Sequence, residues 1–324
     1  MYLKPKSPFK PYYATDKGEA YFCDTLDLLP FIQNESVDLI LTSPPFALKR
    51  KKEYGNEEED KYCDWFMSFA PHLHRILKSD GSFVLDLGGA YKPGFPVRSI
   101  YQFDLLVRLV RETGFFLSQE FYHYNPARLP APAEWVNVRR VRVKDSVNVV
   151  WWLSKTPNPK ADNRKVLRPY SDSMQNLLKN GYKAKLRPSG HDISENFSKD
   201  NGGAIPPNLL ELANTDSNGR YQQLCREHGV KPHPARYPPQ FAEFFIKFLT
   251  DENDLVFDPF GGSNTTGFVA ERLSRRWFIS ELSEEYLKGS KFRFSEDKLP
   301  VGAAKPRTVS LLEPDSLPLF PSAK

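Results

Sequence analysis

Four consecutive residues in the first part of the chain carry groups that could act on an amino nitrogen. An apolar run at residues 39–42 ends in Ser43, Pro44, Pro45 and Phe46. Prolines have no N–H group and a fixed φ, so the carbonyl oxygens beside them stay free to accept hydrogen bonds from another molecule. The Ser43 hydroxyl and such a carbonyl could accept both N–H bonds of a planar exocyclic amine, while Phe46 stacks on its ring. Taken alone, the tetrad is also typical of a rigid turn after a buried strand.

A glycine-containing loop near the C-terminus is built like a nucleoside-binding loop. The apolar run at residues 254–258 leads into Gly261 and Gly262, and a helix is expected to begin near Thr265. Glycines let the backbone approach a ligand closely, and a helix N-terminus supplies free N–H donors. The loop lacks the lysine of a phosphate-binding loop and the G-x-G-x-x-G spacing, which favours a nucleoside without phosphates. The Asp258 carboxylate would suit an amine-bearing ligand such as the amino-acid end of S-adenosylmethionine.

A second carboxylate supports a ligand at this loop. Residues 277–281 (WFISE) predict a strand that ends in Glu281, at about the separation where nucleotide-binding folds place an acid on the ribose hydroxyls. A glycine-rich turn without a ligand is the alternative, but the two features together favour a cofactor. The candidate cofactor-binding residues here are Asp258, Pro259, Phe260, Gly261, Gly262, Ser263, Asn264, Thr265, Thr266 and Glu281.

The elements that must position these residues follow an alternating pattern. Short β-branched or aromatic runs predict strands, and apolar residues at helical spacing predict helices between them. Strands alternating with helices predict an α/β domain with a mostly parallel, largely buried sheet. The expected strands are 36–42, 82–87, 115–124, 146–153, 254–258 and 277–281, and the helical patterns cover 62–77, 103–112 and 241–249.

The chain is long enough for one large core and a smaller inserted region. It has 324 residues and a net charge of +5, which would help it approach a polyanion. No apolar run is long enough to span a bilayer, and the N-terminal residues lack the apolar core of a secretory signal. The three cysteines, Cys23, Cys63 and Cys225, have no metal-ligand spacing, which argues against structural zinc. We expect a cytoplasmic protein.

The composition of the sequence changes between the two motifs, from about residue 155 to 230. Proline, glycine, asparagine and charged residues interrupt every periodic run, as in SGHDISENFSKDNGGAIPPN. We expect residues 1–154 and 232–298 to be the two halves of one catalytic domain and 155–231 to be an inserted region. A nucleic-acid-reading surface and a solvated insertion are equally compatible with the composition of that region. Residues 299–324 are predicted to be a disordered tail.

Together, the two motifs resemble those of the DNA amino-methyltransferases. That family has an Asp/Asn/Ser-Pro-Pro-Tyr/Phe catalytic tetrad and a cofactor loop similar to Asp-Pro-Phe-x-Gly-Ser-Gly-Thr-Thr, matched here by SPPF at 43–46 and DPFGGSNTT at 258–266. Asn264 stands where many relatives have glycine. The motif order resembles the permuted β group, with a target-recognition region between the motifs. The resemblance implies a Rossmann-like S-adenosylmethionine-dependent methyltransferase sheet, circularly permuted in motif order, with an inserted smaller target-recognition region.

The resemblance, which spans about residues 20–295, adds further expectations. It is close to the N4-cytosine modification methyltransferases, and it implies that His233 and Pro234 lie at the cofactor and that Asp24 binds its adenine. Serine at the first tetrad position is the mark of cytosine-N4 members. The implied function is that of the modification enzyme of a restriction-modification system, with the inner cytosine of duplex CAGCTG as the implied target.

An adenine-N6 DNA methyltransferase, a protein or RNA methyltransferase and a non-catalytic DNA-binding module are the alternatives, whereas cytosine-C5 methylation is not expected. Adenine-N6 methylation shares the cofactor and the fold, although its enzymes usually have Asp or Asn where Ser43 stands. Cytosine-C5 methylation would need a cysteine in a Pro-Cys context, which the chain lacks. A non-catalytic DNA-binding module would require damage to the tetrad or the loop, and neither shows any.

Methylation at cytosine N4 requires the base to leave the double helix, because N4 lies within the base pair. Two basic clusters could hold phosphates beside the flipped nucleotide, and we expect neither cluster to be offset by a nearby acid. Polar residues in 155–231 could read base edges. A solvated surface or a structural role is the alternative for each. The candidates are Lys49, Arg50, Lys51, Lys52, Arg139, Arg140, Arg142, His191, Asp192, Lys199 and Asn201.

One feature of the C-terminal tail suggests a protein partner. Residues 315–320 (DSLPLF) resemble the short leucine-rich peptides that dock on the bacterial sliding clamp. A solvated tail without a partner is the alternative.

Overall fold

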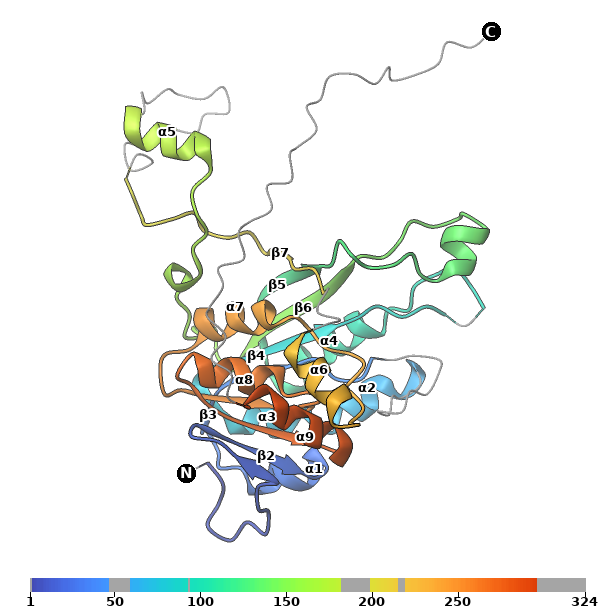
Figure 1. Ribbon diagram of the computed structural model, residues 1–324, viewed down its shortest axis with the longest axis vertical. Coiled ribbons are helices and arrows are strands. Elements are labelled where there is room, and N and C mark those ends of the chain that lie inside the picture. The colour runs from blue at the N-terminus through green and yellow to red at the C-terminus, as the bar shows by residue number, and fades with distance from the viewer. Residues whose placement is uncertain (1, 47–58, 93, 182–198, 215–218, 296–324) are drawn as a thin grey trace. The chain divides into compact units, whose positions relative to one another are not determined.

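A nine-stranded sheet is the centre of the fold in the part of the chain that the computed structural model describes, residues 2–46, 59–92, 94–181, 199–214 and 219–295. The strand order is β1-β2-β9-β8-β3-β4-β6-β5-β7, and β2 to β7 are labelled in Figure 1. The strands are β1 (Tyr13–Ala14), β2 (Gly18–Phe22), β3 (Val37–Thr42), β4 (Leu77–Leu87), β5 (Phe116–Tyr124), β6 (Val147–Ser154), β7 (Leu209–Glu211), β8 (Leu255–Asp258) and β9 (Arg276–Glu281).

Most neighbouring strands are parallel, which confirms the predicted α/β class. The pairs β2–β9, β9–β8, β8–β3, β3–β4 and β5–β7 are parallel, whereas β1–β2, β4–β6 and β6–β5 are antiparallel. The strand β7 comes from the region expected to be an insertion, and it extends the main sheet at its edge. Residues 1–294 form one compact unit.

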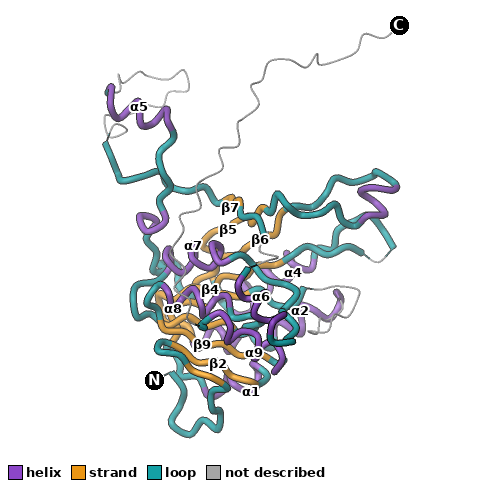
Figure 2. The backbone as a smooth tube through the Cα atoms, viewed as in Figure 1, coloured by secondary structure: helices purple, strands orange, loops and turns teal. Residues whose placement is uncertain are grey.

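Helices cover both faces of the sheet (Figure 2). Buried residues of α2, α3 and α4 pack in one core with β3 and β4, and those of α7, α8 and α9 pack in a second core on the other face. No helix in the described ranges is long and apolar enough to cross a membrane. The helices are α1 (Thr25–Leu28), α2 (Glu59–Met67), α3 (Ala70–Ile76), α4 (Tyr101–Thr113), α5 (Asp172–Asn180), α6 (Arg220–Glu227), α7 (Pro239–Leu249), α8 (Thr265–Arg272) and α9 (Glu284–Ser290).

The helical pattern at residues 62–77 forms two helices instead of one. The helix α2 ends at Met67, and α3 begins at Ala70 with Pro71 in its first turn. Proline has no N–H group to donate to the carbonyl four residues earlier, and its ring clashes with that carbonyl. The apolar spacing continues across the break, so both helices still bury residues such as Phe66 and Leu73 in the same core.

A buried carboxylate connects three strands at the end of the sheet opposite the two motifs. Asp38 on β3 is 4% exposed, and its Oδ1 accepts a hydrogen bond from Lys78 Nζ of β4 at 2.7 Å. Its Oδ2 accepts a hydrogen bond from the backbone N–H of Leu255, the first residue of β8, at 2.8 Å. Asp38 therefore fixes β8 beside β3.

We predict that Asp38→Ala lowers the free energy of unfolding by about 2–3 kcal/mol, because the buried Leu255 N–H loses its acceptor. Urea denaturation of the purified protein measures this change. Asp64→Ala is the matched control, since Asp64 is exposed and pairs with Arg108 at the surface. Its effect is expected to stay within about 1 kcal/mol. Equal effects of the two substitutions would contradict the role given to Asp38.

Candidate active site

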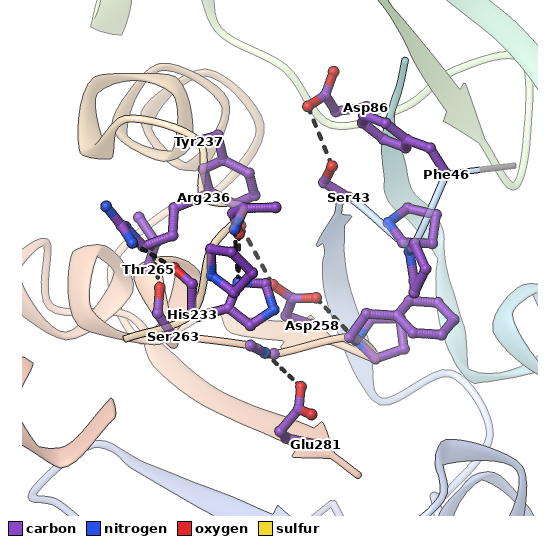
Figure 3. Close-up of a pocket in the computed structure, with 18 of the residues that line it drawn as sticks. Ser43, Phe46, Asp86, His233, Arg236, Tyr237, Asp258, Ser263, Thr265 and Glu281 are labelled. Carbon is purple, nitrogen blue, oxygen red and sulfur yellow. Dashed lines mark hydrogen bonds between the residues drawn. The ribbon is translucent and has the colours of Figure 1, made fainter. Parts of the chain in front are cut away.

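A cavity of about 510 Å³ lies at the carboxyl ends of β3, β4, β8 and β9. Ligands bind at this edge in open α/β sheets. Both predicted motifs reach the cavity, although they are far apart in the sequence, because β3 and β8 are neighbours (Figure 3). The predicted residues that line it are Asp24, Ser43, Pro44, Pro45, Phe46, His233, Pro234, Asp258, Pro259, Phe260, Gly261, Gly262, Ser263, Thr265 and Glu281.

Asp258, at the tip of β8, holds several parts of the site together. It is 2% exposed, and its Oδ1 accepts hydrogen bonds from Thr42 Oγ1 at 2.6 Å and from the Phe260 N–H at 3.1 Å. Its Oδ2 accepts hydrogen bonds from Thr266 Oγ1 at 2.6 Å and from the Tyr237 hydroxyl at 3.3 Å. Burial raises the pKa of Asp258, and the hydrogen bonds from the two threonines oppose that rise. Most of its accepting capacity is therefore used within the protein.

The two glycines of the loop are required by its geometry. A Cβ atom at Gly261 would lie 2.6 Å from the Ile279 side chain on β9, so only glycine allows the loop to pack on that strand. Gly262 has a φ of +52°, in the left-handed region, and its N–H donates to Glu281 Oε2 at 2.8 Å. The loop is thus held against the end of β9.

Two predicted loop residues do not line the cavity. Asn264 has a φ of +54°, and its side chain is fully buried as the N-cap of α8, accepting a hydrogen bond from the Gly267 N–H at 2.9 Å. Its Nδ2 donates to the Tyr13 hydroxyl at 2.9 Å. Thr266 is buried, and its hydroxyl donates to Asp258. The interactions of Asn264 and Thr266 stabilise the loop from the protein interior.

Two further carboxylates, Glu281 and Asp24, line the cavity on the side of the glycine loop. Glu281 accepts a hydrogen bond from the Ser283 N–H at 2.8 Å in addition to the one from Gly262. Burial raises the pKa of Glu281, and these backbone N–H groups oppose the rise. Asp24 caps α1 by accepting a hydrogen bond from the Leu26 N–H at 2.9 Å.

The segment before α7 borders the same side. The backbone N–H of His233 donates to the Tyr221 hydroxyl at 3.0 Å, and its ring Nδ1 lies 2.5 Å from the carbonyl oxygen of Ala235. Burial lowers the pKa of His233 to about 4. The imidazole is therefore neutral at pH 7. Arg236 and Tyr237 follow in the chain and also line the cavity (Figure 3).

The tetrad lies on the other side of the cavity, beside a carboxylate that the sequence analysis missed. The Ser43 hydroxyl donates to Asp86 Oδ2 at 3.3 Å, and Asp86 is 3% exposed near the end of β4 (Figure 3). Burial raises the pKa of Asp86, while nearby His123 and the Ser43 hydrogen bond oppose the rise. A Cβ atom at Gly88 would lie 2.4 Å from the Phe46 ring, so this glycine makes room for the tetrad aromatic. The run Asp86-Leu-Gly-Gly at the end of a strand was the signal for this residue.

The antiparallel strands β5 and β6 supply further polar groups that the sequence analysis missed. His123 and Asn148 are cross-strand partners, and both line the cavity. Arg128 follows β5 and donates from Nη1 to Asn148 Oδ1 at 3.0 Å. Polar residues within otherwise apolar strands were the available signal. The other lining residues missed are Thr25, Leu26, Trp65, Phe69, Asn125, Asn214, Ala235, Arg236, Tyr237, Ser280 and Leu282.

The candidate DNA contacts among the residues that the structure describes do not line this cavity. Arg139 and Arg140 are exposed between β5 and β6. Arg142 is half-buried, lies 4.9 Å from the centre of the Tyr91 ring, and has its Nη2 3.7 Å from an oxygen of Asp145. The expectation that no acid offsets this cluster was therefore wrong for Arg142. Lys199 and Asn201 are exposed, and the other candidates lie outside the described residues: Lys49, Arg50, Lys51, Lys52, His191 and Asp192.

The buried imidazole predicts a pH dependence of stability. The unfolded chain takes up a proton at His233 below about pH 6.5, whereas the folded chain does so only near pH 4. The stabilisation is therefore complete above pH 6.5 and is lost as the pH falls towards 4. Between pH 7.5 and 5.0, the wild type should lose about 1–2 kcal/mol more unfolding free energy than His233→Asn. Urea denaturation at both pH values measures this difference, and parallel losses would contradict it.

Comparisons with known proteins agree with this geometry. Residues 37–292 match the family model N6_N4_Mtase, described as DNA methylase. The Type II methyltransferase M.PvuII of Proteus hauseri is 56% identical over 293 residues, which cover 90% of this chain and 87% of that protein. The DNA adenine methyltransferase YhdJ of Escherichia coli K12 is 25% identical over 267 residues, which cover 82% of this chain and 78% of that protein.

Solved structures show the same fold. The structure titled PvuII DNA methyltransferase (cytosine-N4-specific) has a TM-score of 0.74 at 49% identity and covers 90% of this chain and 92% of that chain. The putative DNA modification methylase TTHA0409 of Thermus thermophilus, solved in complex with S-adenosyl-L-methionine, has a TM-score of 0.53 at 18% identity and covers 86% of this chain and 93% of that chain. The sheet is thus a methyltransferase sheet, and the chain belongs to the N6/N4 DNA methylase family.

Proposed function

We propose that this enzyme transfers the methyl group of S-adenosylmethionine to N4 of a cytosine flipped out of duplex DNA. The observation that carries the proposal is Ser43, which stands at the first tetrad position and donates to the buried Asp86 at the wall of the cavity. The family membership supports DNA as the substrate. A protein 49% identical whose title specifies cytosine N4 supports the choice of base.

The cofactor side of the cavity suits S-adenosylmethionine by the chemistry of its groups. Glu281 is an acceptor for ribose hydroxyls, and Asp24 is an acceptor for the adenine amino group. Thr265 is the first residue of α8 and Ser263 precedes its N-cap, and the N-terminus of this helix would attract the carboxylate of the amino-acid end. The loop glycines keep the backbone close to the ligand. The cofactor supplies the methyl group, and Asp258 holds its loop next to the tetrad strand.

The acceptor side can position and activate the amino group. The Ser43 hydroxyl gives its hydrogen to Asp86, so its oxygen lone pairs remain available to accept an N–H bond from cytosine N4. The Pro44 carbonyl accepts the other N–H bond, and Phe46 stacks on the ring. These bonds draw the amino lone pair out of conjugation with the ring and aim it at the methyl group. Asp86, which accepts the hydrogen of Ser43, is the carboxylate that we propose as the acceptor of the proton that N4 releases.

DNA contacts are assigned to residues outside the cavity. We propose that the exposed Arg139 and Arg140 bind phosphates and that the exposed Lys199 and Asn201 approach base edges. We also propose the region 155–231 as the target-recognition region. We propose a modification enzyme of a restriction-modification system that acts on the inner cytosine of duplex CAGCTG. Such an enzyme protects the DNA of its own cell, which places it in the cytoplasm.

The first prediction of this proposal concerns the product. Incubation with duplex CAGCTG DNA and methyl-labelled S-adenosylmethionine should yield N4-methylcytosine, identified by nuclease digestion and mass spectrometry. Ser43→Ala should lower kcat by about 100-fold or more, because the amino group loses an acceptor used in the transition state. The matched control is Ser68→Ala, an exposed serine outside the cavity, which should leave the rate unchanged.

The outcomes separate the alternatives. N6-methyladenine would retain the fold and the cofactor but overturn the choice of base made from Ser43. No labelled nucleoside on DNA of varied sequence would overturn DNA as the acceptor. Full activity of Ser43→Ala would overturn the mechanism while leaving the product assignment intact.

A protein partner is a separate proposal. Residues 315–320 lie outside the described residues, and their sequence is the ground for proposing that they dock on the bacterial sliding clamp. We predict that immobilised clamp retains the full-length protein but not a chain truncated after Lys305. Equal recovery of both proteins would overturn the proposal. Because the cavity residues precede the truncation, both proteins should methylate DNA at the same rate.

A further inference from the structure

Arg128 is a cationic side chain in the cavity to which the proposed mechanism gives no role. It lines the main cavity and also a neighbouring one of about 340 Å³. Its guanidinium group is half-buried and donates to Asn148 Oδ1 at 3.0 Å. Burial lowers the pKa of Arg128, and the charge of Asp86 opposes this effect. Among the residues that the structure describes, no carboxylate lies within 4 Å of its nitrogens.

The register of the sheet places Arg128 in a row of polar groups that begins at the tetrad. Asp86 on β4 is paired with Val150 on β6, and Asn148 lies two residues before Val150. Residues two apart on a strand share a face, so Asp86 and Asn148 lie on the same side of the sheet. Ser43 donates to Asp86 at one end of the row, and Arg128 donates to Asn148 at the other.

The row changes from acceptors to donors along its length. Ser43 and Asp86 offer oxygen lone pairs at the tetrad end. The Arg128 guanidinium offers only N–H donors at the other end, and just one of its five is used by Asn148 among the interactions described. A partly desolvated guanidinium with spare donors is a binding group for a carbonyl oxygen, because a charge-assisted hydrogen bond offsets the cost of its burial.

Cytosine has the complementary order of groups along its Watson–Crick edge. The amino group N4 is the donor at one end, the carbonyl oxygen O2 is the acceptor at the other, and the acceptor N3 lies between them. Resting on the proposed function, we propose that Arg128 binds O2 of the flipped cytosine while N4 lies at Ser43, and that Asn148 holds the guanidinium in place.

This arrangement would discriminate against the other bases that could enter the cavity. Adenine also carries an amino group next to a ring nitrogen, but it has a C–H group where cytosine has O2. The Arg128 donors would then be left without an acceptor. Thymine has O2 but presents the acceptor O4 to Ser43 and Asp86, where a donor is required. A site rejects a wrong base more strongly by leaving a buried polar group without a partner than by losing an apolar contact.

The test compares two target bases in otherwise identical duplexes. One duplex carries cytosine, and the other carries the 2-aminopyridine C-nucleoside, which keeps the amino group and the ring nitrogen but has no carbonyl oxygen. Arg128→Met should lower kcat/KM on the cytosine duplex by about 10- to 100-fold, the range for one lost charged base contact. On the analogue duplex, Arg128→Met should react at least as fast as the wild type, because only the wild type leaves the guanidinium donors without an acceptor there.

The matched control is Arg139→Met, which removes an exposed arginine from the same connection between β5 and β6. It should change kcat/KM by the same factor on both duplexes, as expected for a phosphate contact. Titration with S-adenosylhomocysteine checks folding, because Arg128→Met should bind it as tightly as the wild type does.

The outcomes of these experiments distinguish the contact with O2 from the proposed function. A loss in Arg128→Met that is equal on both duplexes, with cofactor binding intact, would overturn the contact with O2. Weaker binding of S-adenosylhomocysteine by Arg128→Met would also overturn the contact with O2. Arg128→Lys keeps the positive charge and should recover part of the activity on the cytosine duplex, and no recovery would count against the contact. Failure of the wild type to form N4-methylcytosine would instead overturn the proposed function itself.

Discussion

The buried carboxylate of Asp258 is the interaction on which the arrangement of the site depends. A carboxylate that is 2% exposed would be strongly destabilising without partners, and its four hydrogen bonds come from four different segments. One donor is Thr42, the residue immediately before the tetrad, and another is Thr266 in the first turn of α8. The position of Ser43 is thereby set relative to the glycine loop by one side chain, which is the relation that the proposed methyl transfer needs.

Much of the fold could be predicted from local patterns, because the central strands are nearly continuous apolar runs. The six expected strands all form, and the last residues of β3, β8 and β9 are the ones expected. The short strands β1, β2 and β7 were not expected, since each pairs at or near an edge and two of them have only two or three residues. The break at Pro71 lay within an uninterrupted apolar pattern. Spacing alone therefore could not reveal it.

The site could be predicted only in part, because some of its residues form a contiguous motif and others do not. The tetrad and the loop are contiguous in the sequence, so their residue types and spacing carry a signal. Asp86, His123, Arg128 and Asn148 are single polar residues on three different segments, and only the pairing of β4, β6 and β5 brings them to one wall. Asn264 and Thr266 show the converse, because they belong to the loop motif in sequence but face the protein interior.

The strand order has a consequence for how the enzyme is made. The strands β2 and β3 emerge early from the ribosome, but each pairs with a strand near the far end of the chain. The partner of β2 is β9, and the partner of β3 is β8. Until residue 258 has been synthesised β3 keeps an unpaired edge, and β2 keeps one until residue 281, and such an edge is the kind of surface that recruits other chains. These late, non-local pairings also delay assembly of the sheet. The growing polypeptide can therefore complete the methyl-transfer site only near the end of translation, and its unpaired strand edges are open to association with other chains until then.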